Sequence, residues 1–184
     1  METEFQGWQP QRISVVGTTG AGKTTIAREI SNRLQLPHVE LDALYWDKNW
    51  QGVPEEVFRA RVLAAICAEQ WVIDGNYSRV RPLIWARADT VVYLDYTFGR
   101  VFWQLVRRTF QRSLRQEELW QGNREEFRKS FFSQDSILWW MLRTYHRRRK
   151  QYAHLLQQPE YAHLHVVQLR TPKMTNAWLS SLQR

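Results

Sequence analysis

Short apolar runs recur along the chain and alternate with longer segments whose apolar positions have helical spacing. Runs that are apolar on both faces are typical of buried parallel strands, which carry helices on both sides of the sheet. Five runs therefore predict strands at residues 12–16, 38–41, 71–75, 90–95 and 165–169. Strands that alternate with helices indicate an α/β protein. We predict a three-layer α/β/α fold around a five-stranded parallel sheet.

Helices are expected between these strands. After the first run, Ile26, Ala27, Ile30 and Leu34 keep helical spacing and predict a helix over about residues 23–34. Thr171 and Pro172 supply the N-cap and the first-turn proline of a last helix. Further helices are expected over residues 54–68, from residue 98 onwards and over residues 137–156, whereas the aromatic stretch at residues 42–52 is expected to be irregular.

The segment between the fourth and fifth strands is too long for a simple crossover. Its middle, at about residues 113–134, is polar and charged and contains Gly122 and Asn123. Such a segment is typical of an exposed insertion. We therefore interpret residues 1–184 as a single domain with a lid-like insertion at about 113–134.

Composition narrows the class of protein. A hydrophobic content of 43% over 184 residues excludes disorder for most of the chain. The single cysteine, Cys67, excludes an internal disulfide and is expected to be a core thiol. The sequence shows neither an apolar run of membrane-spanning length nor a signal pattern at its start, so we expect a cytoplasmic protein without a membrane partner.

The net charge of +8 is unevenly distributed, because many arginines lie in residues 98–150. A basic excess favours polyanionic partners, which are nucleotides, nucleic acid or acidic lipid surfaces. Charge alone does not separate these three. The block from Arg147 to Lys150 is expected to be a solvated helix face.

Candidate chemistry first appears directly after the first strand. Gly17, Gly22, Lys23 and Thr24 match the phosphate-loop (P-loop) pattern G-x-x-x-x-G-K-[ST]. Glycines allow a tight turn whose N–H groups surround a phosphate, and the following helix adds its positive end. The lysine reaches the β- and γ-phosphates, and the threonine hydroxyl is a Mg²⁺ ligand. We therefore predict a site for ATP and Mg²⁺ at Gly17, Thr18, Thr19, Gly20, Ala21, Gly22, Lys23, Thr24 and Thr25.

The chain resembles the adenylate kinase-like small-molecule kinases in the segment from Thr19 to Thr25. The stretches LDALYW, WVIDGNYSRV and RADTVVYLD resemble more closely the bacterial P-loop kinases labelled DNA topology modulation, or FlaR-like, proteins. This resemblance covers most of the chain. It implies a five-stranded parallel sheet, a lid and phosphate transfer from ATP.

Two aspartates end apolar strands and are candidates for the acid near Mg²⁺. In kinases of the resembled fold, this acid comes from the strand beside the P-loop strand, which corresponds to Asp74. Asp95 is then expected to be a structural or helix-capping acid.

The resemblance places the phosphate acceptor near the end of the second strand. Asp42 lies there and could accept the proton of an attacking hydroxyl, although a turn or N-cap aspartate would occupy the same position. The nearby Tyr45, Trp46 and Trp50 fit either an acceptor pocket or packing. The resembled kinases also contact the acceptor from the turn after the third strand, which makes Asn76, Arg79 and Arg81 candidates; surface roles for the two arginines remain open.

Phosphate transfer also needs cations that neutralise the charge on the transferred group. Adenylate kinase-like lids supply arginines from their entering and returning helices. By this analogy, the candidates are Arg108, Arg112, Arg124 and Arg143.

Three functions fit these features. The leading hypothesis is an ATP- and Mg²⁺-dependent kinase for a small hydroxyl- or phosphate-bearing acceptor, with nucleotides among the candidates. The second is a nucleic-acid-binding P-loop protein that uses ATP as a switch, supported by the basic charge and opposed by the lack of a DNA-reading module. The third is a P-loop scaffold without catalysis, against which the intact Lys23, Thr24 and Asp74 argue. The identity of the acceptor and the oligomeric state cannot be deduced from these patterns.

Overall fold

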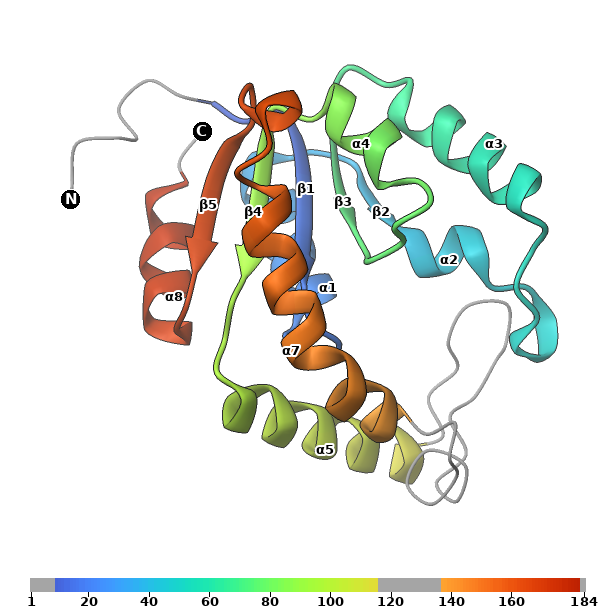
Figure 1. Cartoon of the computed structure of the whole chain (residues 1–184), viewed down its shortest axis with the longest axis vertical. Helices are drawn as coiled ribbons and strands as arrows, with labels where there is room; N and C mark the ends of the chain where they lie inside the picture. Colours follow the sequence, from blue (N-terminus) through green and yellow to red (C-terminus); the bar gives the residue numbers. More distant parts are fainter. Residues whose placement is uncertain (1–8, 116–136, 183–184) are drawn as a thin grey trace.

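The protein is built around a five-stranded sheet (Figure 1). The computed structural model describes residues 9–115 and 137–182. All neighbouring strands are parallel and follow the order β2-β3-β1-β4-β5, which confirms the predicted fold class. The strands are β1 (Arg12–Gly17), β2 (His38–Glu40), β3 (Trp71–Asp74), β4 (Thr90–Leu94) and β5 (His165–Leu169).

Helices connect the strands and cover both faces of the sheet (Figure 1). The α-helices described are α1 (Lys23–Leu34), α2 (Leu41–Tyr45), α3 (Glu55–Ile66), α4 (Arg81–Arg87), α5 (Phe98–Arg115), α7 (Ile137–Leu155) and α8 (Pro172–Ser181). Two short 3₁₀ turns, η1 (Lys48–Trp50) and η3 (Pro159–Tyr161), complete the description. The N-cap expected before the last helix is present, because the Thr171 hydroxyl accepts a hydrogen bond from the Met174 amide at 3.1 Å.

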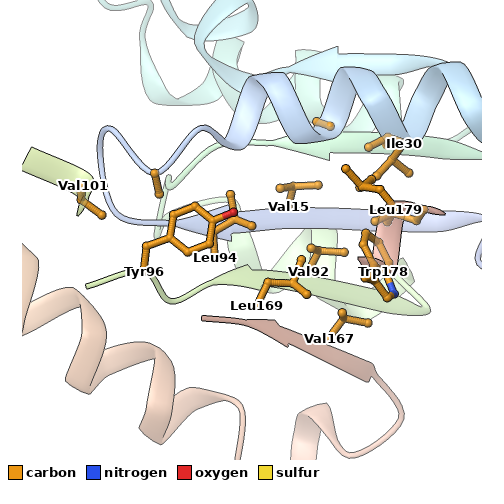
Figure 2. Packing of buried hydrophobic residues seen from close by; sticks show 14 of the residues in the cluster. Val15, Ile30, Val92, Leu94, Tyr96, Val101, Val167, Leu169, Trp178 and Leu179 are labelled. Carbon is orange, nitrogen blue, oxygen red and sulfur yellow. The ribbon is translucent and has the colours of Figure 1, made fainter. Parts of the chain in front are cut away.

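The sheet separates two hydrophobic cores because successive strand residues point to opposite faces. On one face, Val15 of β1 and Val92 of β4 pack against Ile30 of α1 and Trp178 of α8 (Figure 2). On the other face, side chains of α3, α4 and the C-terminal half of α7 cover Val16, Ile73 and Tyr93. These two cores fix the sheet between its helical layers.

Parallel pairing brings the carboxyl ends of the strands to one edge of the sheet. Val15 of β1 pairs with Asp74 of β3, and Gly17 pairs with Leu94 of β4. The helix α5 lies beyond this edge, and α7 returns from it along one face of the sheet (Figure 1). The chemistry-bearing residues predicted after β1, β2 and β3 therefore lie near one another.

Two local expectations are wrong. Cys67 is exposed rather than buried, because the apolar stripe of α3 is formed by Phe58, Val62 and Ile66, and the next position turns toward solvent. Part of the stretch at 42–52 is helical, in α2 and η1, rather than irregular.

The predicted lid at about 113–134 lies almost wholly outside the described residues, and residues 113–115 form the last turn of α5. Within the described residues, no helix is both long enough and apolar enough to cross a membrane.

Candidate active site

The loop from Gly17 to Gly22 joins the end of β1 to the start of α1. Gly22 is the N-cap of α1 and has φ 88°, a left-handed value that a residue with a Cβ atom adopts only with strain. At Gly20, a Cβ atom would lie 2.9 Å from Cβ of Leu105 on α5. The loop is therefore a tight turn pressed against α5, and the free N–H groups at the start of α1 lie beside it.

Lys23 lies in the first turn of α1, and its Nζ donates a hydrogen bond to the Thr18 carbonyl at 3.3 Å. Burial lowers the pKa of Lys23 to about 8, although the nearby carboxylates of Asp74 and Asp42 act in the opposite direction. The ammonium group is therefore close enough to the two carboxylates that the sequence singled out for both of their charges to act on it. The hydroxyl of Thr18 is buried, and Oγ1 has no hydrogen-bond partner among the described residues.

Asp74, at the end of β3, is held from two sides. The Thr24 hydroxyl donates a hydrogen bond to its Oδ2 at 2.6 Å, and the His38 ring nitrogen Nε2 lies 2.9 Å from its Oδ1. The Asp74 side chain is 5% exposed and that of His38 is 13% exposed. The structure thus brings together the hydroxyl and the carboxylate that the sequence assigned to Mg²⁺.

The residues present fit a nucleotide with its Mg²⁺ ion. A Cβ atom placed on Gly22 would have no neighbouring atom within 4 Å, so there is open space where the helix begins. The buried, unpartnered Thr18 hydroxyl and the Lys23 ammonium group supply donors on the same loop. Thr24 and Asp74 offer oxygen atoms, which are the ligands that Mg²⁺ prefers.

Asp42 lies in α2, directly after β2, and contacts the turn that follows β3. The Tyr77 hydroxyl donates a hydrogen bond to its Oδ1 at 2.5 Å. Burial raises the pKa of Tyr77, and the Asp42 charge raises it further, so this hydroxyl stays protonated. The rings of Tyr45 and Phe58 pack on Tyr77 with centroids 4.9 Å away, which holds the Tyr77 side chain in place.

The three candidates that follow β3 have different partners. Asn76 donates from Nδ2 to the Gly17 carbonyl and accepts at Oδ1 from the Tyr152 hydroxyl at 2.9 Å. Arg79 forms an exposed ion pair with Glu55 at 2.8 Å. Arg81 lies over the ring of Trp85, with its Cζ atom 5.6 Å from the centroid, and lines a cavity of about 10 Å³. The structure therefore gives each of the three a contact within the chain, while Nε of Arg81 is buried without a hydrogen-bond partner among the described residues.

Of the four predicted lid arginines, the structure describes the side chains of Arg108 and Arg143. Arg108 of α5 is close enough to Lys23 for its charge to lower the pKa of Lys23, although burial of Lys23 is the larger cause. Arg143 is exposed and stacks over Trp139, one turn earlier on α7, at 5.8 Å; the structure does not bring it to the P-loop. The side chain of Arg112 and the whole of Arg124 lie outside the described residues.

No family model matches the chain. Among curated proteins, the shikimate kinase of Enterococcus faecalis is 38% identical over 45 residues, which cover 24% of this chain and 27% of that protein. The shikimate kinase structure from Bacteroides thetaiotaomicron superposes with a TM-score of 0.55 at 17% identity and covers 95% of this chain and 97% of that one. A gluconokinase structure from Sinorhizobium meliloti 1021 gives a TM-score of 0.54 at 16% identity and covers 94% and 91%.

The chain has a P-loop kinase fold. The curated relative is matched over little more than a quarter of its length, and the solved structures share too little sequence to show more than the fold.

Within this P-loop kinase fold, the structure adds residues that the sequence did not single out. His38 contacts Asp74, Tyr152 contacts Asn76, and Arg148 is half-buried on α7. Burial lowers the pKa of Arg148, and the charge on Asp42 raises it, so Arg148 lies near the Asp42 carboxylate. His38 could have been singled out in the sequence, because it is a polar residue at the start of an apolar run. Nothing in the local pattern distinguishes Arg148 from its basic neighbours.

The block from Arg147 to Lys150 is thus not a uniformly solvated helix face. Arg149 binds Asp95 through two nitrogen atoms, at 2.6 and 3.1 Å. Asp95 also accepts a hydrogen bond from Gln168 at 3.0 Å and lies 3.9 Å from Arg170. These partners make Asp95 a structural acid that fixes α7 to the end of β4, as expected, while the Arg149 side chain itself stays exposed.

Proposed function

We propose that this chain is an ATP- and Mg²⁺-dependent kinase that transfers the γ-phosphate to a small-molecule acceptor with a hydroxyl or phosphate group. One observation carries the proposal: the charges of Asp74, which is bonded to Thr24, and of Asp42 both act on the Lys23 ammonium group of the P-loop. These are the charged groups that an in-line transfer needs, with an acid for the metal, a cation for the phosphates and a base for the acceptor. The names of the relatives, shikimate kinase and gluconokinase, support the same reaction class.

Each residue of the candidate site has a defined role in this proposal. The loop amides and the Lys23 ammonium group bind and orient the phosphates. Bound ATP supplies the phosphoryl group, and Mg²⁺ held near Thr24 and Asp74 neutralises charge on its phosphates. His38 holds Oδ1 of Asp74, so that Oδ2 faces the Thr24 hydroxyl.

Asp42 acts on the acceptor. Tyr77 binds its Oδ1, which leaves Oδ2 directed elsewhere to accept the proton of the attacking hydroxyl. The Tyr77 bond holds the carboxylate in one orientation, which is the positional requirement of a general base. Asp42 is therefore the base, and Tyr77 is the residue that orients it.

Arg148 is the cation that we assign to the transferred phosphate on the side of α7, in place of Arg143. Its charge influences both Lys23 and Asp42, whereas Arg143 stacks on Trp139 at the outer surface of the helix. A cation between donor and acceptor stabilises the charge that develops during transfer. Arg108 is assigned the same role from α5.

The acceptor and the exact family remain proposals. The motifs LDALYW and WVIDGNYSRV support membership of the DNA topology modulation, FlaR-like group. Because Arg79 is paired with Glu55 and Arg81 lies over the Trp85 ring, we favour an acceptor recognised first through a hydroxyl group. Nucleosides, nucleotides, sugars and small hydroxy acids are the classes to test.

The test is a phosphate-transfer assay with ATP and Mg²⁺ across these acceptor classes. Lys23→Ala is expected to reduce transfer by at least about a hundredfold, because an unneutralised transition state loses several kcal/mol. Lys173→Ala removes an exposed lysine of α8 and is the matched control, with activity expected to be unchanged. Asp42→Asn is expected to reduce the rate of transfer while ATP binding persists.

Two results would contradict the proposal. One is ATP binding without transfer to any acceptor class, which would favour the scaffold hypothesis. The other is tight, salt-dependent binding of duplex DNA that modulates ATP hydrolysis, which would favour the nucleic-acid alternative.

A further inference from the structure

Three residues on one face of α7, about one turn apart, form hydrogen bonds with residues that directly follow strands of the sheet. The Tyr145 hydroxyl donates a hydrogen bond to the Tyr96 carbonyl at 2.8 Å, Arg149 binds Asp95, and the Tyr152 hydroxyl binds Asn76. These three residues are spaced by four and three positions and therefore share one face of the helix. Asp95 and Tyr96 follow β4, whereas Asn76 follows β3, so the bonds lie on both sides of β1 and its P-loop.

The bond at Tyr152 differs from the other two because it continues into the P-loop. Tyr152 is 3% exposed, and its ring packs against Tyr93 with centroids 5.3 Å apart. Its hydroxyl donates to Oδ1 of Asn76, and Nδ2 of Asn76 donates to the Gly17 carbonyl. A continuous path of two hydrogen bonds therefore joins α7 to the first residue of the loop.

Position 76 requires an amide side chain. The side chain there must accept a hydrogen bond from a hydroxyl and donate one to a carbonyl at the same time, which a carboxylate, an ammonium group or an apolar side chain cannot do. The orientation of the amide is fixed as well, because the opposite one would place two oxygen acceptors, from Asn76 and Gly17, against each other. The identity of Asn76 thus has a chemical reason other than acceptor binding.

The bond to Gly17 acts on the loop through peptide geometry. A trans peptide is planar, and its C=O and N–H groups point in opposite directions. Holding the Gly17 carbonyl toward Asn76 therefore sets the direction of the Thr18 N–H group. The Thr18 carbonyl in turn accepts hydrogen bonds from the Ala21 amide at 3.1 Å and from Lys23.

We propose that Asn76 and Tyr152 are positioning residues, which hold the first peptide of the P-loop against α7 and so preform the loop for nucleotide binding. Its effect on the rate of phosphate transfer rests on the proposed function. Its effect on nucleotide binding can be measured without any acceptor. Arg148 lies one turn before Tyr152 on α7, so the same contact also fixes the helix that carries this cation.

Two variants test the proposal. Tyr152→Phe removes the hydroxyl and keeps the ring, while Asn76→Asp keeps the acceptor for Tyr152 but has no donor for Gly17. The cavity of about 10 Å³ beside Asn76 has room for about one water molecule, which could replace the hydroxyl in the first variant. The second variant avoids this, because a water molecule cannot restore the direct bond to Gly17.

Tyr145→Phe is the matched control. It removes a buried tyrosine hydrogen bond of similar length from the same helix, but its partner is the Tyr96 carbonyl rather than Asn76. All variants are compared below their melting temperatures by calorimetry with Mg²⁺ and a non-hydrolysable ATP analogue. Hydrogen exchange of the amides in residues 17–22 is measured without ligand.

We expect Tyr152→Phe and Asn76→Asp to weaken binding of the analogue about tenfold, which is about 1.4 kcal/mol. Exchange in residues 17–22 should become faster in both. The double variant should be no worse than Asn76→Asp, because the two residues act along one path. Tyr145→Phe should lower the melting temperature comparably and leave the dissociation constant within about twofold of the wild type, since a merely structural loss does not reach the loop.

The proposal is overturned if both variants match Tyr145→Phe in binding and exchange, or if their effects simply add in the double variant. If Asn76→Asp does not fold, Asn76→Ala, which also removes the donor to the Gly17 carbonyl, decides by the same two measurements. If the wild-type protein binds the analogue but transfers phosphate to no acceptor, the proposed function fails, while binding and exchange still decide the roles of Asn76 and Tyr152.

Discussion

Lys23 carries the charge on which the proposed phosphate site depends, and burial of this charge has a cost to the fold. The P-loop turns back over its side chain, so that Nζ contacts the Thr18 carbonyl. Burial lowers its pKa to about 8 despite two nearby carboxylates. An ammonium group whose pKa is lower in the folded state than in the unfolded chain destabilises the folded state at neutral pH.

Lys23→Met should therefore stabilise the protein while it abolishes nucleotide binding. At pH 7, we expect the free energy of unfolding to rise by about 1–3 kcal/mol. The unfolded chain holds the proton up to about pH 10.5 and the folded protein only up to about pH 8. Between these values, the wild type should gain stability relative to the variant as the pH rises. Urea unfolding without nucleotide from pH 7 to pH 10 measures this, and an advantage of the variant that grows with pH would contradict it.

Single residues differ in how far the sequence can predict their position. Thr24 is one residue from Lys23 in a motif with fixed geometry, and Asp74 ends an apolar run, so their proximity in space follows from a parallel sheet. The contact of His38 with Asp74 depends on β2 lying beside β3 in a particular register, with His38 opposite Val72. No local pattern encodes that register, which is why His38 could not be predicted as a partner of Asp74.

At the scale of elements, α7 shows how one basic run can serve different tasks. Arg147 and Lys150 are exposed, Arg148 is half-buried near the P-loop, and Arg149 binds Asp95. Successive helix positions are rotated by about 100°, so four consecutive basic residues point in four directions. Charge density along the sequence therefore cannot reveal which of them faces the sheet.

Arg149→Met is expected to lower the free energy of unfolding by about 1–3 kcal/mol, because it leaves the 5% exposed Asp95 carboxylate with fewer donors. Arg147→Met, two positions earlier and exposed, should change the stability by less than about 0.5 kcal/mol. Chemical unfolding of the two variants and the wild type checks the difference. Equal stabilities for both variants would show that Arg149 does not fix α7 to β4.

The strands and long helices could be predicted because each is a sustained pattern of apolar residues. The five runs coincide with β1 to β5 to within about one residue at either end. The short helix α2 could not be predicted, because five residues, Leu41–Tyr45, complete little more than one turn and its position depends on packing against α3. Cys67 was misplaced for a related reason, since one position past an apolar stripe is enough to reverse burial.

At the scale of the molecule, the parallel sheet separates two kinds of acid. The carboxyl edge carries Asp42 and Asp74 near the P-loop, where we propose that they serve phosphate transfer. At the opposite edge, Asp89 precedes β4 and accepts hydrogen bonds from the backbone amides of Gln11 and Arg12 at 3.1 and 2.8 Å. Its backbone also pairs with Arg12 and with His165, so Asp89 ties together the first residues of β1, β4 and β5.

Asp89→Ala should therefore affect stability alone. Loss of the carboxylate removes the acceptor of two amides and of the Thr90 hydroxyl, which lies at 2.7 Å, and we expect the free energy of unfolding to fall by about 1–3 kcal/mol. Dissociation constants for the ATP analogue should stay within about twofold of the wild type, because the length of β1 lies between Asp89 and the P-loop. Asp42→Asn should show the reverse pattern, with transfer reduced and stability nearly unchanged. Parallel unfolding and calorimetry on both variants compare the two edges, and weakened nucleotide binding in Asp89→Ala would show that the sheet transmits strain from one edge to the other.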